Sequence, residues 1–262
     1  MIFVKDFFTK NINIILEGVL EYFTNIFTGS VTEWDNQLDD ELQNRIKNLK
    51  ENLLEVSNDE KKKYYGDVGE EIVIDKLKRC CMPMFIIHDL NICYNDMKIQ
   101  NDLVVILKNA ILIIECKNWA GSYTVDRQGN FIQTSKFNSE LNEFVDSSHG
   151  VFSPVSQSLE HYNLIRTIIK EKLFLDEQDF QQRCLNALIH IVVIANEKCV
   201  IDLSNAPADI QDKVIKYDQI NRYLEKFFSQ NTFLFTKYEM MTIAKQLVNE
   251  DIGANLLTIN IL

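Results

Sequence analysis

The stretch Gln100–Trp119, which reads Q-N-D-L-V-V-I-L-K-N-A-I-L-I-I-E-C-K-N-W, decides the fold of this chain. It holds two short apolar runs, Leu103–Leu107 and Ala110–Ile114, which are separated by the polar pair Lys108-Asn109. Runs of this length, rich in Val and Ile and broken by a polar pair, predict a β-hairpin that is buried on both faces.

Three charged side chains stand at the open end of this predicted hairpin. If the polar pair forms a two-residue loop, the register places Asp102 opposite Glu115, with Cβ atoms about 5 Å apart. Lys117 follows Glu115 by two residues and shares its face, whereas Cys116 points to the other side. Two carboxylates this close repel each other unless a proton or a cation lies between them. The pattern therefore indicates a chemical site and not only a structural arrangement.

The arrangement D-(x12)-E-x-K resembles the core of the PD-(D/E)XK nucleases, and the surrounding residues narrow the resemblance to the nuclease-related domain (NERD) family. The similarity spans roughly Gly66 to the C-terminus, and the matching pieces are G-D-V-G-E at Gly66–Glu70, Q-N-D at Gln100–Asp102, I-E-C-K-N-W-A-G at Ile114–Gly121 and S-P-V-S-Q at Ser153–Gln157. The E-x-K triplet alone is a weak signal, but four pieces in order are a strong one. The chain departs from the family at Leu103, where the family often has histidine.

The order of the predicted strands and helices indicates an α/β fold with a mixed central sheet. The resemblance implies that this sheet is a restriction-endonuclease-like core flanked by helices. We expect residues 63–262 to form the nuclease-related domain and residues 1–62 to form an N-terminal helical region.

The acids of the predicted site are hard oxygen ligands. Asp102, Glu115 and Glu70 together suit Mg²⁺ or Mn²⁺, whereas zinc would favour Cys or His. Lys117 can neutralise charge that develops on a phosphate and can orient or deprotonate the attacking water. The resemblance further implies that the main-chain carbonyl of Cys116 is an extra ligand and that Gln157 helps to fix the active site. For Gln157, a surface capping role is the alternative.

Helical spacing indicates which of two adjacent acids, Glu70 or Glu71, belongs to the predicted site. Glu70 shares a face with the apolar residues Val73 and Leu77, so we expect it to point toward the sheet. Glu71 lies beside Lys78 on the side that we expect to be solvated. The alternative for Glu70 is a structural acid that the helix dipole favours in the first turn.

Composition limits the functional classes. A net charge of −11 is a poor fit to a protein that coats nucleic acid through bulk electrostatics, although a local groove and a metal can still carry binding. The six cysteines show no metal-ligand spacing and are expected to be reduced thiols of a cytosolic protein. The sequence shows no secretory signal pattern and no uncharged apolar run of about 20 residues. We therefore expect a cytoplasmic protein without stable membrane insertion.

The N-terminal 62 residues are expected to mediate association. Residues 1–30 predict a helix with a broad apolar face that packs on the main domain or on a second copy; an interfacial membrane anchor is the alternative. Asp35–Glu60 predicts a second helix with a narrow apolar stripe, which suits packing against one other helix. A homodimer or a protein partner bound through residues 1–62 is the expectation.

Several other residues are less specific. Trp119 could stack on a base, but packing is favoured, and His190 within an apolar run is expected to be a core histidine. Candidate phosphate contacts, each also explained as a solvated charge, are Lys76, Arg79, Arg127, Lys136 and Arg166.

The function that these observations favour is a Mg²⁺-dependent nuclease that hydrolyses phosphodiester bonds, with DNA as the favoured substrate. By resemblance alone, a role in bacterial antiviral defence or DNA processing follows. The alternatives are a catalytically silent NERD-fold binding or assembly module that acts through its N-terminal helices, and a membrane-associated regulator anchored by residues 1–30.

Overall fold

The computed structural model describes residues 60, 62–138, 143–173, 177–230, 234–249 and 255–259. The chain divides into two compact units, Met1–Glu60 and Lys61–Leu262, and the fold described below is that of the second unit. The two N-terminal helices, the homodimer seam and the membrane anchor considered above lie outside the described residues.

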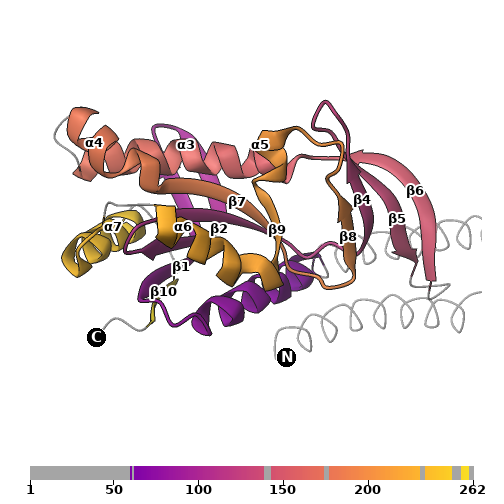
Figure 1. Cartoon of the computed structure of the whole chain (residues 1–262), viewed down its shortest axis with the longest axis horizontal. Helices are drawn as coiled ribbons and strands as arrows, with labels where there is room; N and C mark the ends of the chain where they lie inside the picture. The colour runs from indigo at the N-terminus through magenta and orange to yellow at the C-terminus, as the bar shows by residue number, and fades with distance from the viewer. Residues whose placement is uncertain are drawn as a thin grey trace, which may run out of the picture. The chain divides into compact units, whose positions relative to one another are not determined.

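A six-stranded mixed sheet forms the centre of this unit (Figure 1). Its strand order is β10-β1-β2-β3-β7-β9, in which neighbours from β10 to β3 pair antiparallel and β7 and β9 continue parallel to β3. The strands are β1 (Met84–Tyr94), β2 (Met97–Leu107), β3 (Ile111–Lys117), β7 (Leu188–Ile194), β9 (Val214–Lys216) and β10 (Asn255–Ile259). The predicted mixed central sheet is confirmed.

The predicted hairpin is β2–β3, and it occupies the middle of the sheet. The pairs run from Ile106↔Ile111 to Leu103↔Ile114, which is the predicted register, and the main-chain N–H of Leu107 donates to the carbonyl of Ala110 at 2.8 Å. Every residue of both apolar runs is fully buried. Because burying one such side chain stabilises a fold by about 1.5–3 kcal/mol, this hairpin dominates the core.

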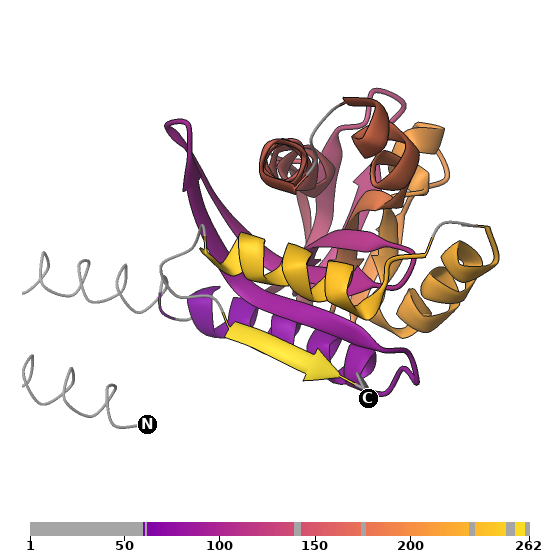
Figure 2. The ribbon, with the colours of Figure 1, turned by 90° about the vertical axis from the view of Figure 1, so that its left-hand side faces the viewer.

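Helices cover both faces of the sheet (Figures 1 and 2). Alternate β2 residues such as Val104 pack in one core with α3 (Pro154–Leu173) and α7 (Lys237–Asn249). The intervening residues, such as Val105, pack in a second core with the helix over residues 62–78 and with α6 (Ile220–Gln230). The remaining helical elements are α4 (Glu177–Arg183), η1 (Leu185–Ala187), α5 (Ala208–Gln211) and η2 (Tyr217–Gln219).

A second, four-stranded sheet has the order β6-β5-β4-β8. It consists of β4 (Gly121–Val125), β5 (Phe131–Asn138), β6 (Glu143–Val151) and β8 (Cys199–Asp202). The polar stretch Lys136–His149 has the composition of a loop, yet β5 and β6 pair antiparallel within this range. Its residues lack a regular apolar face, so the alternation that marks a half-buried strand is missing.

A glycine is required where the chain passes from β3 into this second sheet. Gly121 has a φ of +101°, and a Cβ there would lie 2.2 Å from the carbonyl oxygen of Ser135. Any larger residue would therefore separate β4 from β5. The turn sets the position of the segment that directly follows Lys117, and so it bears on the site.

None of the described helices is both long and apolar enough to cross a membrane.

Candidate active site

Asp102 lies at the point where β2 and β3 stop pairing. Leu103↔Ile114 is the last pair between the two strands at this end of the hairpin, and Asp102 directly precedes Leu103 in β2. Its Oδ2 accepts a hydrogen bond of 2.7 Å from the main-chain N–H of Cys116. The carboxylate is thus held against β3 beside Glu115, its predicted partner, by a backbone donor. The side chain is partly buried at the end of the hairpin.

Glu115 and Lys117 form an ion pair on the side of the sheet that α3 covers. The Nζ of Lys117 lies 2.6 Å from Oε1 of Glu115 and donates a second hydrogen bond of 3.1 Å to Oε1 of Gln157. Gln157 stands in the first turn of α3, where its N–H donates to the carbonyl of Ser153. The structure therefore brings together three of the predicted site residues, and it aims the Gln157 side chain at the lysine.

Glu70 points inward, as its helical spacing predicts. Its Oε2 lies 2.6 Å from Nε2 of His88 on β1, and both side chains are largely buried. Glu71 is exposed, as is the neighbouring ion pair of Lys78 with Asp75. His88 was not among the sequence-predicted residues. It follows a buried apolar run in β1, where a histidine is ambiguous until the facing helix is known.

The first turns of the helix over residues 62–78 are fixed to the segment after Lys117. Gly69 packs so closely that a Cβ there would lie 2.7 Å from Cβ of Asn118. The side-chain amide of Asn118 also donates to the carbonyl of Tyr65 at 2.7 Å. These two contacts place Glu70 beside the end of β3.

The three carboxylates act on one another electrostatically. Burial raises the pKa of Asp102 well above its usual range, and the charges of Glu115 and Glu70 raise it further, against the Cys116 N–H and the Lys117 charge. Burial also raises the pKa of Glu115, with Lys117 opposing and Glu70 adding to the effect. Among the described residues, the three carboxylates face only two contacting groups that can carry positive charge at physiological pH, Lys117 on Glu115 and His88 on Glu70.

A further polar residue, His161, contacts Glu115 and was missed from sequence. Nδ1 of His161 lies 3.4 Å from Oε2 of Glu115 and 3.3 Å from the side-chain nitrogen of Asn101. Burial lowers the pKa of His161 to about 4, so its ring is neutral at physiological pH. His161 stands four residues after Gln157, so the same helical face of α3 that carries the glutamine could have revealed it.

The donor set fits a hard divalent cation. Oε2 of Glu115 is buried and has no hydrogen-bond partner among the described residues. Carboxylate oxygens are the ligands that Mg²⁺ and Mn²⁺ prefer. Within the described ranges, no three His, Cys, Asp or Glu side chains are already arranged to hold an ion. Lys117 contacts one oxygen of Glu115 and His88 contacts one of Glu70, so a cation would compete with both.

A protein-family model described as the nuclease-related domain matches residues 65–196. The chain belongs to the nuclease-related domain family. No curated protein and no solved structure matches it. The family match contains Glu70, Asp102, Glu115, Lys117 and Gln157, together with the Cys116 carbonyl. It ends before β9 and β10, although these strands complete the central sheet of this family member.

Three other residues that the sequence singled out contact neighbouring side chains of the fold. The ring of Trp119 stacks on Tyr123 with centroids 4.4 Å apart and meets Phe131 edge-on, which confirms the predicted packing. His190 contacts the Ser158 hydroxyl at 2.9 Å, and burial lowers its pKa to about 4, as expected of a core histidine. The guanidinium of Arg166 lies 5.6 Å from the centroid of the Phe180 ring, and its contact with phosphate stays a prediction.

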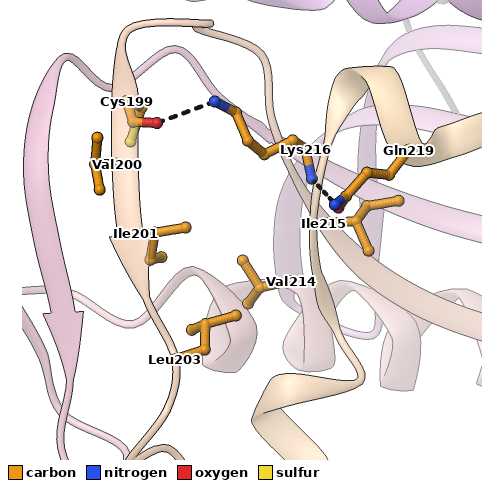
Figure 3. A pocket seen from close by; sticks show the side chains of 8 residues that line it. All are labelled: Cys199, Val200, Ile201, Leu203, Val214, Ile215, Lys216 and Gln219. Carbon is orange, nitrogen blue, oxygen red and sulfur yellow. Dashed lines mark hydrogen bonds between the residues drawn. The ribbon is translucent and has the colours of Figure 1, made fainter.

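The Lys61–Leu262 unit also has a pocket of about 320 Å³ between β8 and β9, outside the residues that the family model matches (Figure 3). Its lining is mainly apolar, with Cys199, Ile201 and Val214 among its members. The Nζ of Lys216 donates to the main-chain carbonyls of Glu197 and Cys199. No acid lines this pocket, so it is separate from the carboxylate site.

Proposed function

We propose that this member of the nuclease-related domain family is a metal-dependent nuclease that hydrolyses phosphodiester bonds of nucleic acid, with DNA as the favoured substrate. The observation that carries the proposal is the ammonium of Lys117, held by Glu115 and Gln157 beside Asp102 at the end of the hairpin. Three carboxylates that contact only two groups able to carry positive charge at physiological pH are suited to recruiting a cation.

The cation would be Mg²⁺ or Mn²⁺. Asp102, Glu115 and Glu70 would hold it, with the main-chain carbonyl of Cys116 as a further ligand. When bound, such a cation supplies Lewis-acid polarisation of the scissile phosphate and neutralises part of its charge. Oε2 of Glu115, which is buried and has no hydrogen-bond partner among the described residues, is the oxygen that such a cation would satisfy.

Lys117 would act on the reacting phosphate and on the attacking water. A fixed ammonium in a partly desolvated site stabilises the charge that builds on the phosphate oxygens. Gln157 holds that ammonium from α3, which restricts its rotamers before substrate arrives. His88 performs the same positioning task for Glu70. A role in defence or DNA processing would require this nuclease activity, and only membership of the family supports such a role.

A catalytically silent assembly module is the competing function. Such a module would not need an acid, an acid and a lysine buried at one strand end, because leaving buried charges only partly compensated destabilises a fold. No described contact favours the assembly role over catalysis.

The test is cleavage of labelled single-stranded and double-stranded oligonucleotides and plasmid in Mg²⁺, in Mn²⁺ and in EDTA. We expect cleavage by the wild type that EDTA abolishes, and a loss of at least about a hundredfold in Lys117→Ala and Asp102→Asn. Lys108→Ala, at the opposite end of the hairpin, is the matched control and should retain full activity. Cleavage that ignores EDTA and both site substitutions would reject the assignment.

A further inference from the structure

Two adjacent tyrosines project from the start of the helix over residues 62–78. The side chains of Tyr64 and Tyr65 are 64% and 58% exposed, and their rings meet edge to face with centroids 5.7 Å apart. Neither phenol hydroxyl has a hydrogen-bond partner among the described residues. Adjacent, exposed and unbonded aromatic rings are uncommon on a surface that serves no binding purpose. The exposed lysines Lys62 and Lys63 precede them.

This tyrosine pair is attached to the catalytic end of β3. The carbonyl of Tyr65 accepts the side-chain amide of Asn118, the residue that follows Lys117. One turn further along, Gly69 packs directly against Asn118. The backbone that carries the two rings is therefore fixed to Asn118, the direct neighbour of the lysine that the proposed function assigns to the scissile phosphate.

A third exposed aromatic is connected to Lys117 through a different helix. Phe152 is 68% exposed and immediately precedes Ser153, whose carbonyl accepts the N–H of Gln157. Because the Gln157 side chain accepts from Lys117, Phe152 is tied to the site through α3, as the tyrosines are through Asn118. The two attachments come from helices that cover opposite faces of the central sheet.

We propose that Tyr64, Tyr65 and Phe152 stack on unpaired bases on either side of the scissile phosphate, so that the substrate is single-stranded nucleic acid. This inference rests on the proposed function. Ring faces can stack only on a base that is not already stacked within a duplex, and single-strand-binding proteins use such aromatic platforms together with nearby lysines.

The charge of the chain favours base stacking over phosphate contacts as the source of affinity. A net charge of −11 is a poor fit to an affinity that comes mainly from many phosphate contacts. Stacking on the three aromatics supplies an attraction that does not depend on net charge, and losing one stacked base typically lowers affinity by about tenfold. Binding should therefore depend strongly on the rings and only weakly on salt.

The experiment measures fluorescence anisotropy of a labelled oligothymidine of roughly 15 nucleotides, with a closed dumbbell duplex as comparison. The full chain is used with Ca²⁺ replacing Mg²⁺, and intact substrate is verified on a gel afterwards. We expect the dumbbell to bind at least about tenfold more weakly than the single strand. Tyr64→Ala/Tyr65→Ala and Phe152→Ala should each weaken single-strand binding by about tenfold or more.

Two matched variants separate stacking from folding. Tyr64→Phe/Tyr65→Phe keeps the ring faces and should bind like the wild type, whereas Tyr64→Leu/Tyr65→Leu keeps apolar bulk without an aromatic face and should bind like the alanine variant. Tyr238→Ala, which removes a 71% exposed tyrosine from α7, should have no effect. Thermal melting checks that each variant is folded.

Equal affinity of the alanine, leucine and phenylalanine variants would overturn the stacking proposal, as would dumbbell binding that matches the single strand. If the same preparation still cleaves in Mg²⁺ and loses cleavage in Lys117→Ala, the nuclease proposal survives that failure. If ring-dependent binding is found without any cleavage in Mg²⁺ or Mn²⁺, the proposed function fails and the single-strand site remains.

Discussion

Nε2 of His88 lies 2.6 Å from Oε2 of Glu70, which joins β1 to the helix over residues 62–78. The hydrogen bond to Glu70 raises the pKa of His88, against the opposing effect of burial. The imidazole is thus favoured in its charged form, and the pair holds Glu70 in its inward position.

We expect His88→Gln to remove a stabilisation that depends on pH. A histidine whose folded pKa is raised stabilises the fold fully below its ordinary pKa of 6.5 and loses that effect as pH rises through the folded value. The free energy of unfolding of wild type should exceed that of His88→Gln by about 1 kcal/mol near pH 5.5 and by less near pH 9. Urea unfolding in EDTA measures the difference, and a difference that grows with pH would contradict the assignment.

Asp102→Asn should stabilise the metal-free protein at neutral and alkaline pH. Burial and the neighbouring acids raise the pKa of Asp102. The contribution of Asp102 to the free energy of unfolding is therefore fully present below its ordinary pKa and is lost as pH rises through its pKa in the folded protein. Asparagine keeps an acceptor for the Cys116 N–H but carries no charge. We expect urea unfolding in EDTA to show a free energy of unfolding about 1 kcal/mol higher for Asp102→Asn than for the wild type.

Asp126 provides a control for the unfolding measurement, because its substitution by asparagine should change stability in the opposite direction. Its pKa is lowered by hydrogen bonds from the side chain and main chain of Asn130, so its stabilisation is present above the ordinary pKa and is lost in acid. Asp126→Asn should therefore destabilise the protein at neutral pH. Stabilisation by both substitutions, or by neither, would contradict the electrostatic account of Asp102.

Gly69→Ala should weaken both the fold and cleavage. Its new Cβ would meet Cβ of Asn118 at 2.7 Å, so the helix must move away from the end of β3, at about 1–3 kcal/mol of stability. Gly66 is the matched control, because no atom lies within 4 Å of a Cβ there. Gly66→Ala should raise stability by up to about 1 kcal/mol, since alanine favours a helix interior. Equal melting temperatures of the two variants would show that the close packing is not important.

The hairpin could be predicted from sequence because its information is local. The apolar runs, the two-residue break and the alternation fix the register as far as Leu103↔Ile114. The inward direction of Glu70 likewise follows from helical spacing, and Pro154 marks the start of α3. In each case, burial along one element decides the outcome.

Long-range pairing could not be predicted. β10 pairs with β1 across most of the sequence, and no pattern in Asn255–Ile259 indicates its partner. The β5–β6 pair is polar, so it resembles a loop. His88 and His161 become site residues only because separate elements converge on Glu70 and Glu115. Tertiary context supplies that convergence, and spacing within one strand does not contain it.

The most direct test of the central claim is a calorimetric titration of Mn²⁺ into the metal-free full chain near pH 7. We predict binding by the wild type, a loss of at least about tenfold in affinity for Asp102→Asn and for Glu115→Gln, and no loss for Lys117→Ala. The last variant removes the ammonium that competes for Oε1 of Glu115, so it should bind Mn²⁺ at least as tightly as the wild type while failing to cleave. Equal Mn²⁺ affinity of the wild type and of the Asp102→Asn/Glu115→Gln double variant would contradict the claim that these two carboxylates share a cation.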